Sequence, residues 1–338
     1  FGYLAGPPLP FAEVTPGSSF ILAFQSLPLV LTISALASLL LHWGILQRVV
    51  RIFAAALQRL MGVGGALSLG AAVHVFVGMV EAPLLIQPYL ARMQRGELFA
   101  LMSCGLAGVA GTVMVVYASI IGTLVPNALG NILVASIVST PAALAIAAIM
   151  VPFGRPEAAE ARLVIHDPPT SAMDALVKGT LNGIPLLAAI IATLLVTVAL
   201  ITLINNGMAW LPSWDDAPIT LQRLLAFPFR PVMWLIGVPW AETALTAKLM
   251  ATKTVLNEFV AYLDFASLPA DALSPGTRMI MTYALCGFAN FGSVGIMVGG
   301  MGVMVPERRH EIVALGIRSM VAGTLATCMS GALAGAFA

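Results

Sequence analysis

Two glutamates, Glu81 and Glu258, are the most informative polar residues of the sequence. Glu81 interrupts a long apolar stretch that is rich in glycine, and Glu258 lies in a segment, 241–265, that is too polar to be a lone membrane span. A carboxylate at hydrocarbon depth is costly unless it has polar partners or water, so by default it indicates a substrate or ion path. The alternative is a structural acid that caps the end of a broken helix. Asn290 adds an amide that both donates and accepts hydrogen bonds. The alternative role of this amide is to join two helices. Together these residue types predict a site that binds a polar solute by hydrogen bonds.

A histidine and several apolar side chains accompany the two acids. His74 precedes the glycine-containing segment 78–83, and either carries a coupling proton or is a neutral imidazole satisfied by a backbone carbonyl. Met79 and Val80 place an apolar surface next to Glu81. Phe288, close to Asn290, either fills the core or lines the site.

The composition identifies the solvent around these residues. Of 338 residues, 59% are hydrophobic and 9% are charged, against roughly 25% charged in globular proteins. Such a chain must be surrounded largely by lipid. A net charge of +1 excludes a broad surface for nucleic acid. Neither a phosphate-binding loop nor a zinc or nucleophile motif occurs, so we expect no enzyme activity, no metal site and no cofactor beyond a coupling cation.

Gaps between charged residues predict the elements. We expect an all-α polytopic membrane protein with two re-entrant hairpins, around Gly78–Pro83 and in 241–265, since glycine, proline and acids there do not suit straight spans. An amphipathic helix at Ile45–Met61 is predicted to present Ile45, Val49, Phe53 and Leu57 on its apolar face. A segment rich in proline and tryptophan, 212–240, is predicted at the outer interface. The predicted spans are 20–43, 98–122, 127–150, 181–211, 279–306 and 312–338.

An internal repeat organises these elements. Cys104–Gly108 recurs as Cys286–Asn290, and in each half a hairpin, a glycine-broken helix and a plain helix follow one another. This order is typical of secondary transporters. It divides the chain into a scaffold span with a cytoplasmic interfacial helix (1–61), a first repeat (62–150), a linker with scaffold span and external segment (151–236), and a second repeat (237–338). Basic residues then gather mostly in inner loops, which predicts that the two repeats are inverted.

Four ordered motifs resemble those of the concentrative nucleoside transporters. They are Gly78–Tyr89, Gly237–Glu242, Leu256–Tyr262 and Tyr283–Ser293, and the similarity runs from about Phe20 to the end. The resemblance implies a homotrimer of the elevator type, in which a transport domain moves past a scaffold. Members have eight spans, so two helices are expected before Phe1.

The resemblance also implies roles for individual residues. It places ribose recognition on Glu258, Asn290 and Ser293, with Phe288 lining the same site. It assigns the base side to Glu81, packed against Met79, Val80 and Val113. Family hairpins usually read Gly-Gln-Thr-Glu, whereas this one reads Gly-Met-Val-Glu at 78–81, and so the base preference stays open.

The residues matching the family's sodium site are His74, Val77, Gly108 and Val109. His74 and Gly108 replace an asparagine and a serine ligand, which removes two side-chain oxygens. We therefore expect coupling to H⁺ in preference to Na⁺, with His74 or Glu81 as the proton carrier. The expected function is cation-coupled nucleoside uptake across a bacterial plasma (inner) membrane. The alternatives are transport of modified nucleosides or another polar solute, a channel, or, least favoured, an intramembrane hydrolase.

Overall fold

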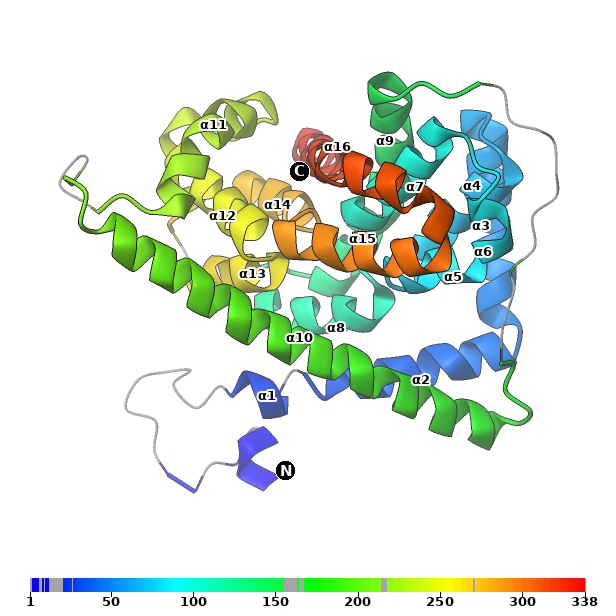
Figure 1. Ribbon diagram of the computed structural model, residues 1–338. Helices are drawn as coiled ribbons and strands as arrows, with labels where there is room; N and C mark the ends of the chain where they lie inside the picture. Colours follow the sequence, from blue (N-terminus) through cyan, green and yellow to red (C-terminus); the bar gives the residue numbers. More distant parts are fainter. Residues whose placement is uncertain are drawn as a thin grey trace.

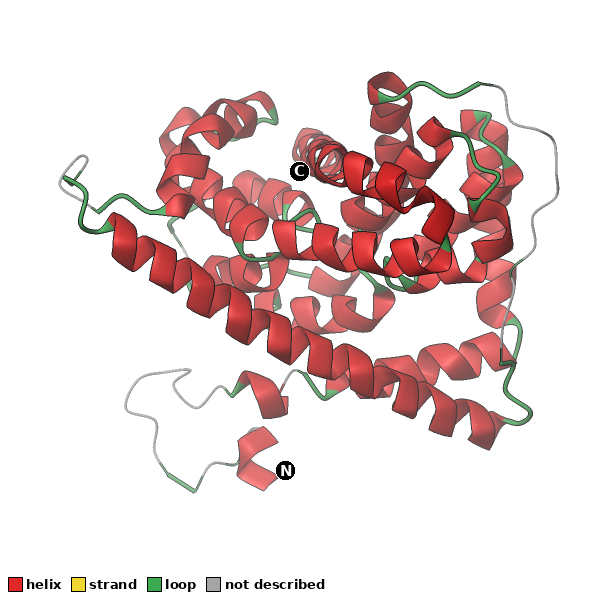
Figure 2. Ribbon diagram, viewed as in Figure 1, coloured by secondary structure: helices red, strands yellow, loops and turns green. Residues whose placement is uncertain are grey.

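The described part of the chain is built from helices and the turns that join them. A computed structural model describes residues 2–5, 8, 10–11, 21–25, 27–154, 163, 167–213, 218–269 and 271–337. Within these ranges no strand occurs (Figure 2). The all-α architecture expected from the sequence is confirmed.

The helices follow one another along the chain with short connections (Figure 1). In the first half they are η1 (Gly2–Ala5), α1 (Leu22–Gln25), α2 (Leu29–His42), α3 (Ile45–Met61), α4 (Gly65–His74), α5 (Glu81–Leu85), α6 (Gln87–Leu90), α7 (Arg95–Ala107), α8 (Gly111–Ile121) and α9 (Ala128–Met150). In the second half they are α10 (Ala172–Met208), α11 (Leu221–Leu235), η2 (Trp240–Glu242), α12 (Thr243–Val255), α13 (Glu258–Ala266), α14 (Pro275–Ala284), α15 (Phe291–Met304), η3 (Pro306–Arg308) and α16 (Arg309–Ala336).

Five helical stretches of the described residues are long and apolar enough to cross a membrane: Ala23–His42, Arg95–Ile121, Ala128–Met150, Ala172–Met208 and Pro306–Ala336. Five of the six predicted spans are among these stretches, and the sixth, 279–306, is the helix that was predicted to be broken by glycines. Segment 279–306 is divided into α14 and α15 by an irregular stretch at 285–290, and each part is too short to cross alone.

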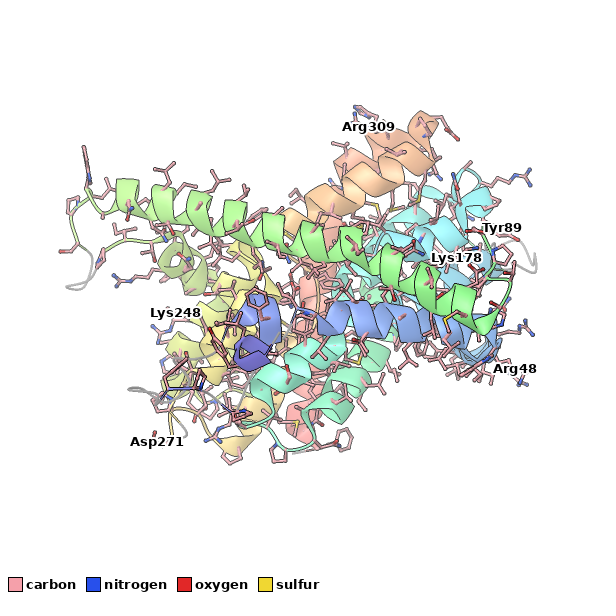
Figure 3. The ribbon with its side chains drawn as sticks, turned by 90° about the horizontal axis from the view of Figure 1, so that it is seen from below. Arg48, Tyr89, Lys178, Lys248, Asp271 and Arg309 are labelled. Carbon is pink, nitrogen blue, oxygen red and sulfur yellow. The ribbon has the colours of Figure 1, made fainter. Side chains whose placement is uncertain are left out.

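The long helix α10 lies side by side with α2 along one edge of the molecule (Figures 1 and 3). Gly179 permits the close approach, because a Cβ atom there would come within 2.7 Å of the Ala35 Cα atom. The 18-residue window that marks α10 as a span contains no buried residue. The pair α2–α10, called the scaffold pair below, therefore stands outside the main helical body.

The amphipathic helix α3 forms where it was predicted, but its buried face is shifted. Val50, Ala54 and Leu57 are buried, whereas Ile45 and Val49 remain exposed. The stripe that faces the neighbouring α4 is thus rotated from the predicted one. The apolar side chains left outside are available to lipid, which costs nothing in a membrane.

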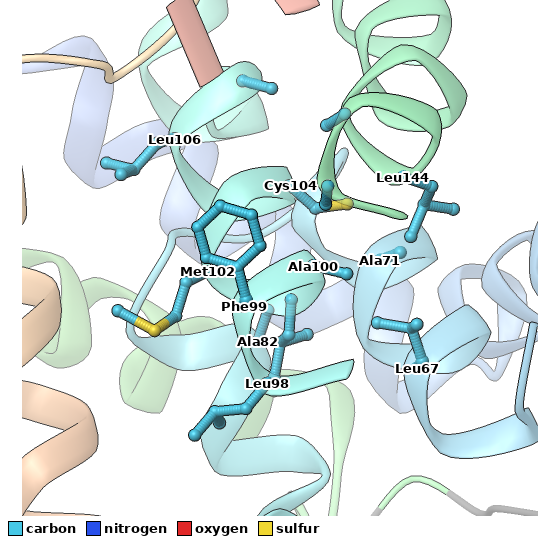
Figure 4. Close-up of a cluster of buried hydrophobic side chains, with 14 of the residues drawn as sticks. Leu67, Ala71, Ala82, Leu98, Phe99, Ala100, Met102, Cys104, Leu106 and Leu144 are labelled. Carbon is cyan, nitrogen blue, oxygen red and sulfur yellow. The ribbon is translucent and has the colours of Figure 1, made fainter. Parts of the chain in front are cut away.

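The two halves of the main body repeat the same order of helices. Helices α4, α5–α6, α7, α8 and α9 correspond to α12, α13, α14, α15 and α16. In the first half an interruption at 108–110 separates α7 from α8. In the second half an interruption at 285–290 separates α14 from α15. The core of the first half joins Leu67 on α4, Ala82 on α5, Phe99 on α7 and Leu144 on α9 (Figure 4).

Several charged side chains lie at the rim of the molecule. Arg48, Lys248, Asp271 and Arg309 are spread around its edge in the view from below (Figure 3). The predicted interfacial segment forms α11 and ends at Trp240, the first residue of η2. Trp240 and Trp210, which lies just before the segment, are both exposed. Trp214, Arg155 and Arg162, which the predicted linker and interfacial segment include, lie outside the described residues.

Candidate functional site

A cavity of about 360 Å³ lies between the two halves and the scaffold pair. Side chains from both halves line it, together with Leu27 and Val30 near the start of α2 and residues 182–194 of α10. All eight residues predicted to contact substrate are among those lining it: Met79, Val80, Glu81, Val113, Glu258, Phe288, Asn290 and Ser293. Their positions span more than two hundred residues of sequence, and the fold brings them to one place.

Glu258 is the most constrained polar group of this cavity. It is the first residue of α13 and is only 5% exposed. Tyr117 Oη donates to its Oε1 at 2.7 Å, and Asn290 Nδ2 donates to its Oε2 at 2.9 Å. The helix N-terminus also favours a negative charge at this position. Because a carboxylate accepts about four hydrogen bonds, both oxygens keep room for ligand hydroxyls.

Asn290 is held by the start of the next helix. It is the N-cap of α15, and its Oδ1 accepts from Ser293 N at 2.7 Å. This bond orients the amide so that Nδ2 points to Glu258. The preceding backbone is fixed as well, since Phe288 N donates to Gly108 O at 3.2 Å and so ties one helix break to the other. The arrangement presents donors and acceptors at fixed positions, which suits a ligand with several hydroxyls.

The opposite wall of the cavity combines an exposed acid with apolar side chains. Glu81 begins α5 and is exposed, and its carboxylate lies against Gly78. Met79 and Val80 are half-buried beside it, and Val113 is buried on α8. This wall therefore offers one charged acceptor next to apolar surface.

The four residues predicted for the coupling ion lie behind this wall and do not line the cavity. His74 ends α4 and is 5% exposed, with its ring against Gly105. In the described part of the chain neither ring nitrogen has a hydrogen-bond partner. Gly108 and Val109 form the break after α7, and Val77 lies in the turn after α4. The backbone bond from Gly111 N to Phe76 O, at 3.3 Å, joins these two segments.

Several polar side chains of the cavity were not predicted. They are Tyr117 and Thr112 on α8, Asn182 on α10 and Asn257, the N-cap of α13. Tyr117 stands four residues after Val113, so both lie on one helix face, and that spacing was a usable signal. No signal in the sequence predicted Asn182, because its place in the cavity lining depends on how α10 crosses the other helices. Within the described ranges, no group of three or more His, Cys, Asp or Glu residues is placed to bind a metal ion.

Comparison with known proteins decides the family. A family model described as "Na+ dependent nucleoside transporter C-terminus" matches residues 131–335, and one described as "Nucleoside recognition" matches residues 23–124. The nucleoside permease NupC of Helicobacter pylori is 33% identical over 99% of this chain and 80% of its own length. The chain belongs to the concentrative nucleoside transporter family. An uncharacterised transporter of Haemophilus influenzae is 39% identical, over 100% of this chain and 80% of that protein.

A solved structure of the concentrative nucleoside transporter family agrees with the fold. The inward-facing, substrate-bound structure of CNTnw superposes with a TM-score of 0.87 at 38% identity, covering 99% of this chain and 79% of that one. The chain is thus a multi-pass membrane protein of a nucleoside transporter family, consistent with a bacterial inner membrane. The relatives reported above are transporters, not enzymes.

Proposed function

We propose that this protein imports nucleosides across the bacterial inner membrane by cation-coupled symport. The observation that carries the proposal is the Glu258 carboxylate, buried beside the cavity and fixed by Tyr117 and Asn290. Two adjacent ribose hydroxyls donate to its free lone pairs, while Asn290 and the N-terminus of α15 near Ser293 complete the polar wall. A charge-assisted hydrogen bond is roughly twice as strong as a neutral one, so the ribose provides the main binding energy.

The base lies against the opposite wall in this proposal. Glu81 accepts from a base N–H, and Met79, Val80 and Val113 contact the ring faces. Because a buried polar edge without a partner costs about 1–3 kcal/mol, this wall favours nucleosides with few polar groups on the base. Modified nucleosides of low polarity are therefore candidate substrates.

We propose H⁺ as the coupling ion. Sodium prefers hard oxygen ligands, and neither His74 nor Gly108 has a side-chain oxygen. The His74 imidazole is buried and neither ring nitrogen has a protein partner in the described structure, so a nitrogen is available to hold the coupling proton. The turns 75–80 and 256–257 are proposed as the tips of two re-entrant hairpins.

The movement proposed is an elevator within a homotrimer. The scaffold pair stays fixed, while the two repeats, 62–150 and 237–338, carry the part of the cavity that they line across the membrane. The interhelical contact supports such a division, since α10 is packed closely on α2 at Gly179 and otherwise exposes apolar side chains.

The test is binding and transport by a Glu258→Gln variant reconstituted in liposomes. Glutamine keeps the shape but removes the charge and one acceptor oxygen, so nucleoside binding should fall below detection. Glu97→Gln is the control, because Glu97 only closes the capping box of α7, away from the cavity. Binding by Glu258→Gln equal to the wild type would refute the ribose assignment.

A channel is the other candidate to be separated. Saturable counterflow, in which internal unlabelled nucleoside accelerates entry of labelled nucleoside, is expected of a transporter and absent from a channel. If liposomes with active wild-type protein show no counterflow, the channel is favoured.

A further inference from the structure

Lys253 is a fully buried lysine that the proposed transport cycle has not used. It lies in the last turn of α12 and its exposed fraction is 0%. Lysine is almost never fully buried without compensation, because removing an ammonium from water costs several kcal/mol. Lys253 lies close to the break at Leu256–Asn257, because α12 ends at Val255. A specific interaction must offset the burial.

The ammonium is bound by neutral acceptors at a helix end. Nζ donates to the carbonyl oxygen of Ala284 at 2.8 Å and to Thr327 Oγ1 at 3.0 Å. Ala284 is the last residue of α14, where unpaired carbonyls give the helix end a partial negative charge. Lys253 therefore closes the carbonyl end of the first part of the interrupted helix α14–α15. The other end of that interruption is Asn290, which contacts Glu258.

No carboxylate in the described ranges lies within ion-pair distance of Lys253, since the recorded ion pairs involve only Lys178 and Arg308. Glu258 follows five residues later, across the break between α12 and α13, and it is buried as well. Both charged groups are buried, so water screens their attraction weakly. A cation behind the site and an anion facing the cavity thus share one low-dielectric region.

The first repeat differs at the matching place. His74 also lies in the last turn before the chain break, and its ring faces Gly105 near the end of α7, the counterpart of α14. There the polar atoms have no partner in the described structure, whereas the Lys253 ammonium has two. At its break one repeat holds an amine with two neutral acceptors, and the other holds an imidazole whose nitrogens have no partner in the described structure.

We propose that Lys253 is a positioning residue for ribose recognition, a fixed cation that closes the carbonyl end of α14 and balances the Glu258 carboxylate from behind. In the second repeat the Lys253 amine occupies the position that corresponds to His74 in the first repeat. The mobile coupling cation is proposed to bind at His74. This inference rests on the proposed function, because it assumes that Glu258 accepts from ribose hydroxyls. Lys253 itself does not reach the cavity.

The experiment compares ligands with and without those hydroxyls. Binding of uridine and adenosine, each against its 2′,3′-dideoxy counterpart, is measured on purified wild-type and Lys253→Met protein. Methionine keeps the length and removes the charge. The preference for the ribonucleoside should fall by about tenfold, a typical effect of removing a weakly screened charge, while affinity for the dideoxy ligand stays within about twofold.

Controls separate this role from a structural one. Ser139→Ala removes the buried Ser139–Ser330 bond of 2.9 Å in the same body and should leave the preference unchanged. Equal losses for both ligands in Lys253→Met, or an unchanged preference, would overturn the proposal. If that variant does not fold, Thr327→Val removes one partner of the ammonium and should lower the preference by a smaller factor; no change there also overturns it. If wild-type protein binds no nucleoside, the proposed function fails first.

Discussion

Tyr117 Oη and Glu258 Oε1 are 2.7 Å apart, although the two residues belong to different repeats. Tyr117 lies on α8, the second part of the first interrupted helix, and Glu258 begins α13 in the other half. The ring of Tyr117 is also 5.1 Å from that of Tyr262, centre to centre. The two halves are therefore joined at the cavity itself, so displacement of α8 relative to α13 would disturb ligand binding.

Replacing Tyr117 by phenylalanine should weaken nucleoside binding by about tenfold or more. The variant removes one donor to a buried carboxylate, and such bonds contribute about 1.5–3 kcal/mol. Equilibrium binding on purified protein measures the change. Tyr262→Phe is the matched control, since the Tyr262 hydroxyl donates to the carbonyl oxygen of Thr282 at 2.8 Å, not to Glu258; its binding constant should change much less. Equal effects of both variants would show that the hydrogen bond to Glu258 has no particular role in binding.

Restoring polar side chains at the hairpin tip should change the base preference. In the double variant Met79→Gln/Val80→Thr, new hydrogen-bond partners face the base, each contributing about 0.5–1.5 kcal/mol. If both new partners bind, affinity for nucleosides with several polar groups on the base should rise by about fivefold to 150-fold relative to less polar ones. A panel of labelled nucleosides in a competition assay measures this ratio. A uniform change across the panel would place the base elsewhere in the cavity.

The sequence allowed the acids, the breaks and the repeat to be predicted because each departs from what lipid tolerates. Glu81 and the glycine-containing breaks are conspicuous in apolar surroundings, and Glu258 lies in a segment that is too polar to cross a membrane alone. The contacts of Tyr117 and Asn182 depend on the angle at which α8 and α10 cross the body. Those angles follow from packing of many similar apolar side chains, which periodicity does not resolve. The shifted face of α3 has the same cause, since Val49 and Val50 are equally apolar.

Sodium dependence should be created by the double variant His74→Asn/Gly108→Ser. The two changes supply side-chain oxygens that the segment lacks, and sodium prefers oxygen ligands. A serine fits at 108, since a Cβ atom there would be no closer than 3.9 Å to the Cβ atom of Ser136. Uptake into liposomes is measured with an inward sodium gradient or an inward proton gradient. Wild-type uptake should follow the proton gradient, and the variant should follow sodium. Wild-type uptake driven by sodium at fixed pH, and indifferent to protons, would refute proton coupling.

Packing of the scaffold pair should be sensitive to a single methyl group. In Gly179→Ala the added carbon would lie 2.6 Å from the Cβ atom of Ser38 and 2.7 Å from the Cα atom of Ala35. The backbone cannot move aside without separating α10 from α2, so overpacking should cost about 1–3 kcal/mol and lower the Tm. Gly207→Ala is the control on the same helix, because nothing lies within 4 Å of its added carbon, and alanine favours a helix over glycine. Thermal unfolding in detergent measures both. Since α2 and α10 also line the cavity, Gly179→Ala should weaken nucleoside binding as well, and an unchanged Tm would mean that the two helices separate easily.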